Sequence, residues 1–221
     1  YDGLGYLPEA MFNFISLLGW SPEGEEEIFS KEELISIFTS DRLSKSPAVF
    51  DTNKLAHLNN HYIKHADPKR IAALAIPHLQ KAGRLPEKLN EDEQAWAESL
   101  VALYQEQMTA ASDIVGLSEL FFRSHLEMDS EAAQILAESQ VSEVLSAFLA
   151  KIEVTNEFTS SNMAVLIKEV QKETGHKGKA LFMPIRVALT GQTHGRDLNI
   201  TIALLGRNRV IERLKSQIKG A

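Results

Sequence analysis

Hydrophobic residues along this chain recur at intervals of three and four positions. One clear case is the run Trp96, Leu100, Leu103, Tyr104 and Met108. This spacing places side chains on one face of an α-helix. No segment shows the sustained alternation of hydrophobic and polar residues that predicts a half-buried β-strand. The pattern therefore predicts an all-α fold.

The residues that begin and end helices support this prediction. Pro8 suits the first turn of a helix, and Ser30 with Glu33 forms a capping-box pattern. Ser46-Pro47 predicts a break, because the residue before a proline avoids the α region. Further helices are expected from Asp51, from Asp67 (with Pro77 kinking or dividing that helix), at about 91–108, 112–122, 130–138, 140–152 and 161–174, and from near Lys179, Asp197 and Gly206.

The segment from Gly83 to Asn90 predicts a loop, because it holds Gly83, Pro86 and Asn90. We place a domain boundary there, which divides the chain into residues 1–83 and 84–221. The sequence also allows a subdivision of the second part near 154–160. The chain begins at Tyr1 and not at a methionine, and we expect it to be part of a longer protein.

The net charge of −7 is unevenly distributed. Residues 171–221 hold ten Lys/Arg and three Asp/Glu, which gives +7, so residues 1–170 carry −14. A basic end on an acidic body predicts a local anionic partner such as RNA or DNA, although a basic helix can also be merely solvated. The chain has no cysteine, and no apolar run approaches the ~20 residues of a membrane span. We expect a cytoplasmic protein without disulfides.

Few residue clusters in this sequence point to catalysis or metal binding. His57, His61 and His65 share one helix face at a spacing that can bind zinc, but no acidic residue lies between them. The acidic run Glu25–Glu27 is expected to be a solvated loop. No nucleophile–base pair stands out, so we predict no catalytic residue and no metal site.

The basic C-terminal part is more specific. Lysine and arginine side chains there can neutralise phosphates, and an arginine guanidinium can hydrogen-bond to, or stack on, an unpaired base. Leu198 and Ile200 add apolar surface beside these residues, although Ile200 is expected in the core. The candidate phosphate contacts are Lys45, Lys177, Lys179, Arg207 and Arg209.

Several blocks of the sequence, in order, resemble bacterial glutamyl–tRNA synthetases, which are class I aminoacyl–tRNA synthetases. Gly5–Ala10 and Leu17–Ser21 are similar to the stretch that follows the family's catalytic lysine loop, and Ser44–Asp51 with Leu58–Ile63 to the next block. The family's C-terminal anticodon-binding block is matched by Met183–Gly191, Thr193–Gly195, Leu204–Gly206 and Arg209–Arg213.

The resemblance implies a helical stem-contact region up to about Gly83, followed by a two-part α-helical anticodon-binding cage. It implies that the Rossmann-type catalytic domain, which uses ATP and Mg²⁺, lies outside this chain and that no cofactor binds here. The implied partner is the tRNA for glutamate, bound by a monomer, within an enzyme that joins glutamate to tRNA.

Four site residues follow from the resemblance. Arg186 matches an arginine that contacts anticodon bases, and Leu198 matches an apolar residue beside them. Arg196 stands where the family usually has the proline of Gly-Pro-Asp-Leu, which places a charge next to the reading site. Gln107 stands where members restricted to the glutamate tRNA carry an arginine that discriminates the third anticodon base, so the resemblance also allows charging of the glutamine tRNA.

Two other interpretations remain open at this point. A helical protein–protein adaptor explains the helices, but neither the confined positive charge nor the ordered blocks. An independent enzyme requires an active site that the sequence does not contain.

Overall fold

The computed structural model describes residues 1–45 and 48–218, and the regular elements among these residues are helices, without a β-strand. The predicted all-α fold is therefore confirmed. One isolated antiparallel bridge joins Trp20 and Leu43. The break expected at Ser46-Pro47 lies outside the described residues.

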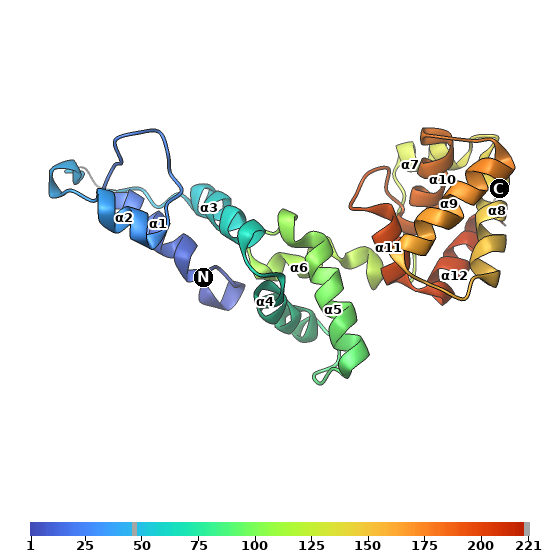
Figure 1. The fold of residues 1–221 in the computed structure, drawn as a ribbon, viewed down its shortest axis with the longest axis horizontal. Coiled ribbons are helices and arrows are strands. Elements are labelled where there is room, and N and C mark those ends of the chain that lie inside the picture. Colours follow the sequence, from blue (N-terminus) through green and yellow to red (C-terminus); the bar gives the residue numbers. More distant parts are fainter. Residues whose placement is uncertain (46–47, 219–221) are drawn as a thin grey trace. The chain divides into compact units, whose positions relative to one another are not determined.

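Internal contacts divide the chain into two compact units, Tyr1–Ser118 and Glu119–Ala221. The helices of the first unit are α1 (Pro8–Gly19), α2 (Lys31–Ile37), α3 (Thr52–His65), α4 (Pro68–Lys81), α5 (Glu91–Tyr104) and α6 (Ile114–Leu117). Those of the second unit are α7 (Ser130–Leu136), α8 (Val141–Val154), α9 (Ser160–Thr174), α10 (Lys179–Thr190), α11 (Leu198–Leu205) and α12 (Arg207–Ile218), as Figure 1 shows.

The expected helix starts are confirmed at the level of single hydrogen bonds. Ser30 and Glu33 form the reciprocal capping box of α2. The carboxylate of Asp51 accepts from the first backbone N–H groups of α3, and Asp67 caps α4 in the same way. Such caps satisfy backbone donors that have no partner inside the helix.

One of the two possibilities at Pro77 is excluded, and one expected helix differs from the structure. Pro77 does not divide α4, because the buried side chains of Ala75, Ile76 and Leu79 hold this helix in the core, where it packs against α5. The helix expected at 112–122 is replaced by short turns and α6. At the end of α6 the buried hydroxyl of Ser118 donates to the carbonyl of Ile114 at 2.6 Å, and such local side-chain bonds compete with a continuous helix.

The loop expected at Gly83–Asn90 exists, but the compact units do not divide there. It joins α4 and α5, which pack against each other inside the first unit. The side-chain amide of Gln80 ties the loop to α4 by donating to the carbonyls of Pro86 and Glu87, at 3.0 Å each. The division of the contacts therefore falls at Ser118, and not at Gly83.

In the first unit, α3 connects the residues just before α1 with the residues that follow α5. The fully buried Asn59 accepts from the backbone N–H of Leu7 at 2.9 Å and donates to the carbonyl of Thr109 at 2.6 Å. A buried amide whose oxygen and nitrogen are both hydrogen-bonded in this way fixes the register of the elements it joins.

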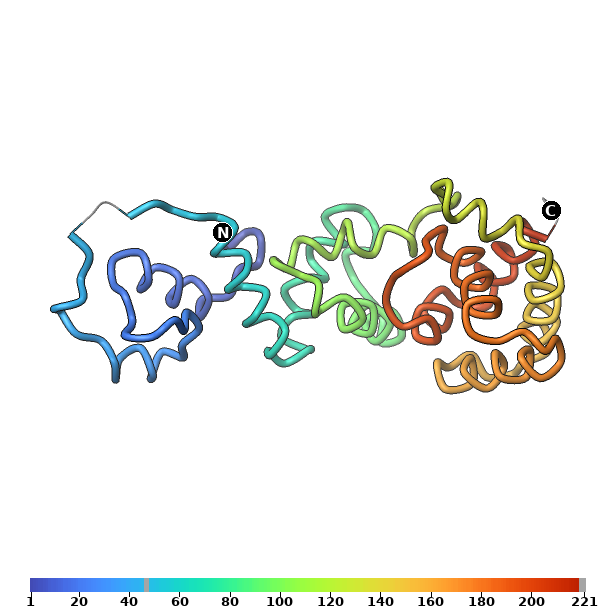
Figure 2. The backbone as a smooth tube through the Cα atoms, turned by 90° about the horizontal axis from the view of Figure 1, so that it is seen from above, coloured from blue at the N-terminus to red at the C-terminus, as the bar shows by residue number. Residues whose placement is uncertain are grey.

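In the second unit, α8 packs against both α9 and α12, and Figures 1 and 2 show these helices side by side. Val144, Phe148 and Ile152 of α8 are fully buried, at the spacing of one helix face. α10 packs on α8 and α12, which places its C-terminal half, with Arg186, over the same core.

Candidate nucleic-acid interface

Arg186 lies on α10 with its guanidinium against the turn that precedes α11. Its Nη1 donates to the carbonyl oxygen of Arg196 at 3.1 Å. Burial lowers the pKa of Arg186 from its ordinary value, and the nearby charge of Asp197 opposes this shift. Asp197 also caps α11 by accepting from the backbone N–H of Ile200 at 2.9 Å. A half-buried guanidinium is thus held in one position beside a helix start.

The turn itself leaves room for this contact. A methyl group added at Gly195 would lie 3.2 Å from Nη1 of Arg186, which is a tight contact. The side chain of Arg196 is half-buried, and its carbonyl supplies the acceptor for Arg186. The residue that distinguishes this turn from the usual Gly-Pro-Asp-Leu is therefore the same residue whose carbonyl binds Arg186.

Leu198 and Ile200 of α11 have exposures that differ from those expected. Leu198 is 7% exposed, and it belongs mainly to the core of the second unit. Ile200, which was expected in the core, is 39% exposed, so that expectation is wrong. The cap at Asp197 fixes the helix phase, and this phase turns position 198 inward and position 200 outward.

Gln107 lies in the first unit, in a single turn of 3-10 helix from Gln105 to Gln107, and its side chain is exposed. The amide of Asn60 donates to the carbonyls on both sides of it, those of Glu106 at 3.0 Å and Met108 at 2.7 Å. Buried Gln105 donates to the carbonyl of Ile63 at 2.8 Å. Gln107 is therefore an exposed side chain on a firmly held backbone.

The candidate phosphate contacts fall into two groups. Lys45, Lys177 and Lys179 are exposed, and none of them forms an ion pair with another described residue. Arg207 and Arg209 instead donate to backbone carbonyls of their own unit. Arg207 binds the carbonyls of Ile152, at 2.7 Å, and of Thr155, at the end of α8.

Arg209 and Arg213 hold α12 to the segment before α7. Nη1 of Arg209 donates to the carbonyl of Phe121, and Arg213 donates to those of Leu189 at 2.6 Å, Leu120 at 2.7 Å and Arg123 at 3.2 Å. Burial, with the charge of Arg209 beside it, lowers the pKa of Arg213 to about 10.

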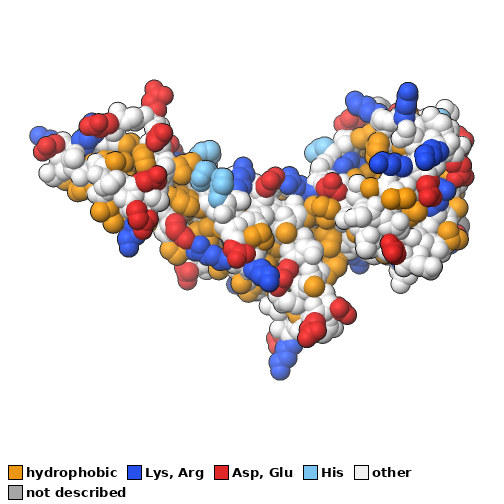
Figure 3. Space-filling model, in the orientation of Figure 1, with side chains coloured by type: hydrophobic (Ala, Val, Ile, Leu, Met, Phe, Trp, Pro, Cys, Tyr) orange, Lys and Arg blue, Asp and Glu red, His pale blue; other side chains and the backbone are white. Residues whose placement is uncertain are grey.

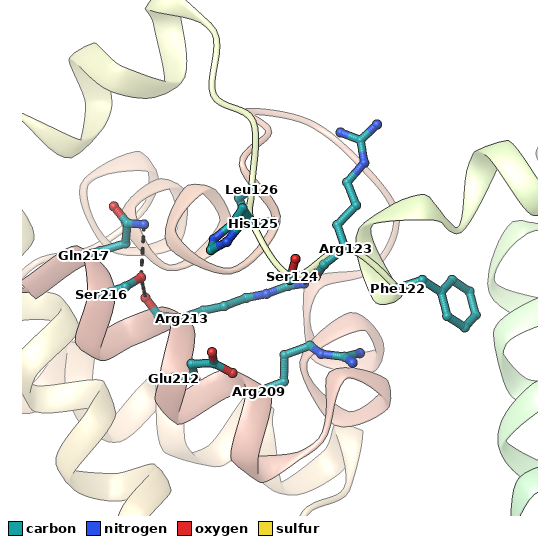
Figure 4. A pocket seen from close by; sticks show the side chains of 10 residues that line it. All are labelled: Phe122, Arg123, Ser124, His125, Leu126, Arg209, Glu212, Arg213, Ser216 and Gln217. Carbon is teal, nitrogen blue, oxygen red and sulfur yellow. Dashed lines mark hydrogen bonds between the residues drawn. The ribbon is translucent and has the colours of Figure 1, made fainter. Parts of the chain in front are cut away.

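Figure 4 shows the pocket of about 470 Å³ that these residues border. The side chain of Arg213 extends across it toward Ser124, while those of Phe122 and Arg123 point away. Arg123 forms ion pairs with Glu119 and Glu127. The arginines of this pocket therefore hold the unit together, a function that their spacing in the sequence did not suggest.

The three histidines of α3 lie at a pocket of the first unit, and they form part of a histidine patch on its surface (Figure 3). Glu25, Glu26 and Glu27 line the same pocket. The rings of His61 and His65 lie 4.3 Å apart, and burial lowers the pKa of His61, as do the charges of its neighbours. Among the described residues, no three such side chains are arranged to hold a metal ion.

The structure therefore brings some of the expected site residues together, and it separates others. Arg186, Arg196 and Leu198 share one short region of the second unit, whereas Gln107 belongs to the first unit. Asp197 and Ile200 lie in the same region, joined by the cap of α11, and Asn60 holds the backbone on both sides of Gln107. The capping pattern Asp197-x-x-Ile200 was readable from the sequence, but the contact of Asn60 across 46 residues was not.

No helix in the described parts of the chain has both the length and the apolar character needed to cross a membrane.

Comparison with known proteins identifies the family. A family described as "Anticodon binding domain" matches residues 70–218, which is more than half of the chain. A second, described as "tRNA synthetases class I (E and Q), catalytic domain", matches residues 1–57.

Among individual proteins, the glutamate–tRNA ligase of Geobacillus stearothermophilus is 59% identical over 219 residues, and that of Bacillus subtilis is 56% identical over 216. These matches cover 99% and 98% of this chain, but in each case the chain spans only 45% of the length of the relative.

Solved structures support the fold. The crystal structure of a glutamate tRNA ligase from Elizabethkingia meningosepticum, in complex with its amino acid, matches with a TM-score of 0.81 at 24% identity. The match covers 97% of this chain and 41% of that one. The chain therefore belongs to the anticodon-binding domain family, and the predicted resemblance to bacterial glutamyl–tRNA synthetases is confirmed.

Proposed function

We propose that this chain is the tRNA-binding and anticodon-reading part of a glutamate–tRNA ligase, with the tRNA for glutamate as its partner. The observation that carries the proposal is the match of residues 70–218 to the anticodon-binding family, together with a fixed, half-buried Arg186 inside the matched region. In this proposal the enzyme works as a monomer in the cytoplasm. An adaptor role without RNA is not favoured, because it explains neither the family match nor the basic C-terminal end.

In this proposal the anticodon is read by N–H donors of Arg186 that the protein holds in a fixed position. One nitrogen of Arg186 is committed to the carbonyl of Arg196, and the other N–H groups of the guanidinium can then face an unpaired base. Because the turn orients the guanidinium in advance, RNA binding does not have to freeze a long flexible side chain. Leu198 and Arg196 complete this reading site, and exposed Lys45, Lys177 and Lys179 contribute phosphate contacts.

Catalysis in this proposal belongs to the part of the enzyme outside this chain. That part would hold ATP, Mg²⁺ and glutamate, and would form glutamyl-adenylate. Residues 1–83 would contact the stem of the tRNA and connect catalysis to tRNA docking, and residues 84–221 would enclose the anticodon. This functional division need not coincide with the division of contacts at Ser118.

We also propose that the enzyme accepts the tRNA for glutamine. The support is the glutamine at position 107, where an arginine would offer donors only. A glutamine side chain offers both a donor and an acceptor, so it can tolerate either C or G as the third anticodon base. The exposed side chain on a fixed backbone suits such a contact.

Binding of the two transcribed tRNAs to this chain, measured as a function of salt, tests both statements. Counterion release predicts that log Kd changes with log salt by roughly 0.7 to 0.9 per phosphate contacted. Absence of binding at low salt would contradict the RNA-binding proposal. A preference of about a hundredfold for the glutamate tRNA, worth roughly 2.7 kcal/mol, would contradict only the proposal for glutamine tRNA.

A further inference from the structure

One face of α10 carries an exposed aromatic ring between two cations. Lys179, Phe182 and Arg186 follow the spacing i, i+3, i+7, which places them on one stripe of the helix. Phe182 is 42% exposed. Four large hydrophobic side chains are strongly exposed in the described part of the second unit, namely Val154, Val165, Phe182 and Ile200, and Phe182 is the aromatic one.

We infer that Phe182 is a stacking platform for an unpaired RNA base next to the base that Arg186 reads, with Lys179 on the adjoining phosphate. This inference rests on the proposed function of the chain, and it names a further residue of the same interface. A single exposed hydrophobic residue is ordinary on a protein surface, so exposure alone would not support it. Its position relative to Arg186 and Lys179 does.

The spacing along the helix fits consecutive nucleotides. Four residues separate Phe182 from Arg186, which corresponds to a rise of about 6 Å along α10. Bases in a stacked strand repeat about every 3.4 Å, so two neighbouring bases fit within this rise. Lys179 lies about one turn closer to the helix start than Phe182. An RNA strand with one base stacked on Phe182 would place its next phosphate there.

The charges around the ring favour an RNA strand over an apolar partner. Lys177 and Lys179 are exposed and form no ion pair with a described residue, whereas Lys151 and Lys215 of the same unit are paired with glutamates. Figure 3 shows Lys and Arg side chains gathered with hydrophobic ones over the region of α9 and α10. A π-face beside uncompensated cations is the usual composition of a site for single-stranded nucleic acid.

The ring also complements Arg186 chemically. Arg186 can discriminate bases through directed N–H groups, whereas stacking on a phenyl ring accepts every base. Phe182 would therefore contribute affinity without base preference. It would also hold the strand in the register that Arg186 requires.

The test uses the full chain and an RNA hairpin that carries the anticodon loop of the glutamate tRNA. Phe182→Leu keeps an apolar side chain but removes the π-face, and we expect the Kd to rise about tenfold, within the range known for base–aromatic stacking. Phe182→Tyr keeps an aromatic ring at this position, and its Kd should equal that of the unsubstituted chain. The matched control is Phe12→Leu, because Phe12 is 41% exposed on α1 in the other unit, and its Kd should not change.

Two further readouts separate stacking from general surface effects. A 2-aminopurine base in the loop should lose fluorescence when the unsubstituted chain binds, and Phe182→Leu should restore that fluorescence. Lys179→Gln should lower the salt slope by about 0.7, as expected for one phosphate of a single strand. Lys215→Gln should leave the slope unchanged, because Lys215 is paired with Glu153 at 2.7 Å.

The outcomes distinguish this inference from the proposed function. If Arg186→Gln weakens binding while Phe182→Leu stays within twofold of the unsubstituted chain, the stacking platform is overturned and the proposed function stands. If 2-aminopurine fluorescence does not change on binding at any loop position, the inference is also overturned. If the unsubstituted chain does not bind the hairpin at low salt, both fail.

Discussion

Arg186 donates a hydrogen bond from Nη1 to the carbonyl oxygen of Arg196 at 3.1 Å. This contact joins the middle of α10 to the turn before α11, and it fixes the orientation of the guanidinium. The helix cap at Asp197 and the absence of a side chain at Gly195 keep the turn in the required position.

Arg186→Lys should weaken binding of the anticodon hairpin by about tenfold or more, because a base contact by an oriented side chain is worth about 1–3 kcal/mol. A lysine keeps the charge, but it lacks the planar fork that can bind the Arg196 carbonyl and a base together. Fluorescence anisotropy of a labelled hairpin measures the change. A hairpin whose anticodon is replaced by three adenines serves as the control, and the variant should bind it like the unsubstituted chain. Equal loss on both hairpins would contradict a reading function.

Gln107→Arg should raise the preference for the glutamate tRNA over the glutamine tRNA by about tenfold or more, because fixed donors discriminate between C and G where an amide does not. Gln107 is exposed, and Asn60 holds the backbone on both sides of it, so the fold should tolerate the change. The ratio of the two Kd values measures the effect. Glu106→Gln, at the exposed neighbouring position, should leave the ratio unchanged, and an unchanged ratio for Gln107→Arg would refute the assignment.

Arg213→Met should destabilise the second unit by about 3 kcal/mol, because three backbone carbonyls lose their donor and buried unpaired acceptors cost about 1–3 kcal/mol each. Part of this cost is offset, since the buried charge that lowers the pKa of Arg213 to about 10 is removed as well. Urea unfolding, with hydrogen exchange at α10 and α12 to locate the change, is the measurement. Lys215→Met, on the same helix but in an exposed ion pair, should cost less than about 1 kcal/mol.

Gly191→Ala should destabilise the end of α10 by more than the 1–2 kcal/mol or so that a left-handed conformation costs an ordinary residue. Gly191 has φ of 73°, and an added Cβ would lie 2.5 Å from the carbonyl oxygen of Glu127. Gly83→Ala is the matched control, because Gly83 has φ of 69° with no atom within 4 Å of an added Cβ. The difference in unfolding free energy between the two variants isolates the steric part, and equal losses would show that the backbone conformation alone accounts for the effect.

The sequence by itself determined the all-α class and the helix caps at Ser30, Asp51 and Asp67. These features depend on residues a few positions apart, so local hydrogen bonding and helical periodicity are enough to define them. The family resemblance was also readable, because its blocks follow one another along the chain.

Tertiary structure alone decided how Gln107 is held, where the chain divides, and what Arg207, Arg209 and Arg213 bind. Asn60 reaches the carbonyl of Glu106, next to Gln107, across 46 residues, and Arg213 reaches that of Leu120 across 93, so no local pattern predicts either contact. The spacing of basic residues along the sequence is compatible with two arrangements. The side chain can face a phosphate of a partner, or it can donate to a backbone carbonyl of its own protein. Only the packing of α12 against the rest of its unit distinguishes the two, because burial decides whether a guanidinium finds its acceptors inside the protein or in a partner.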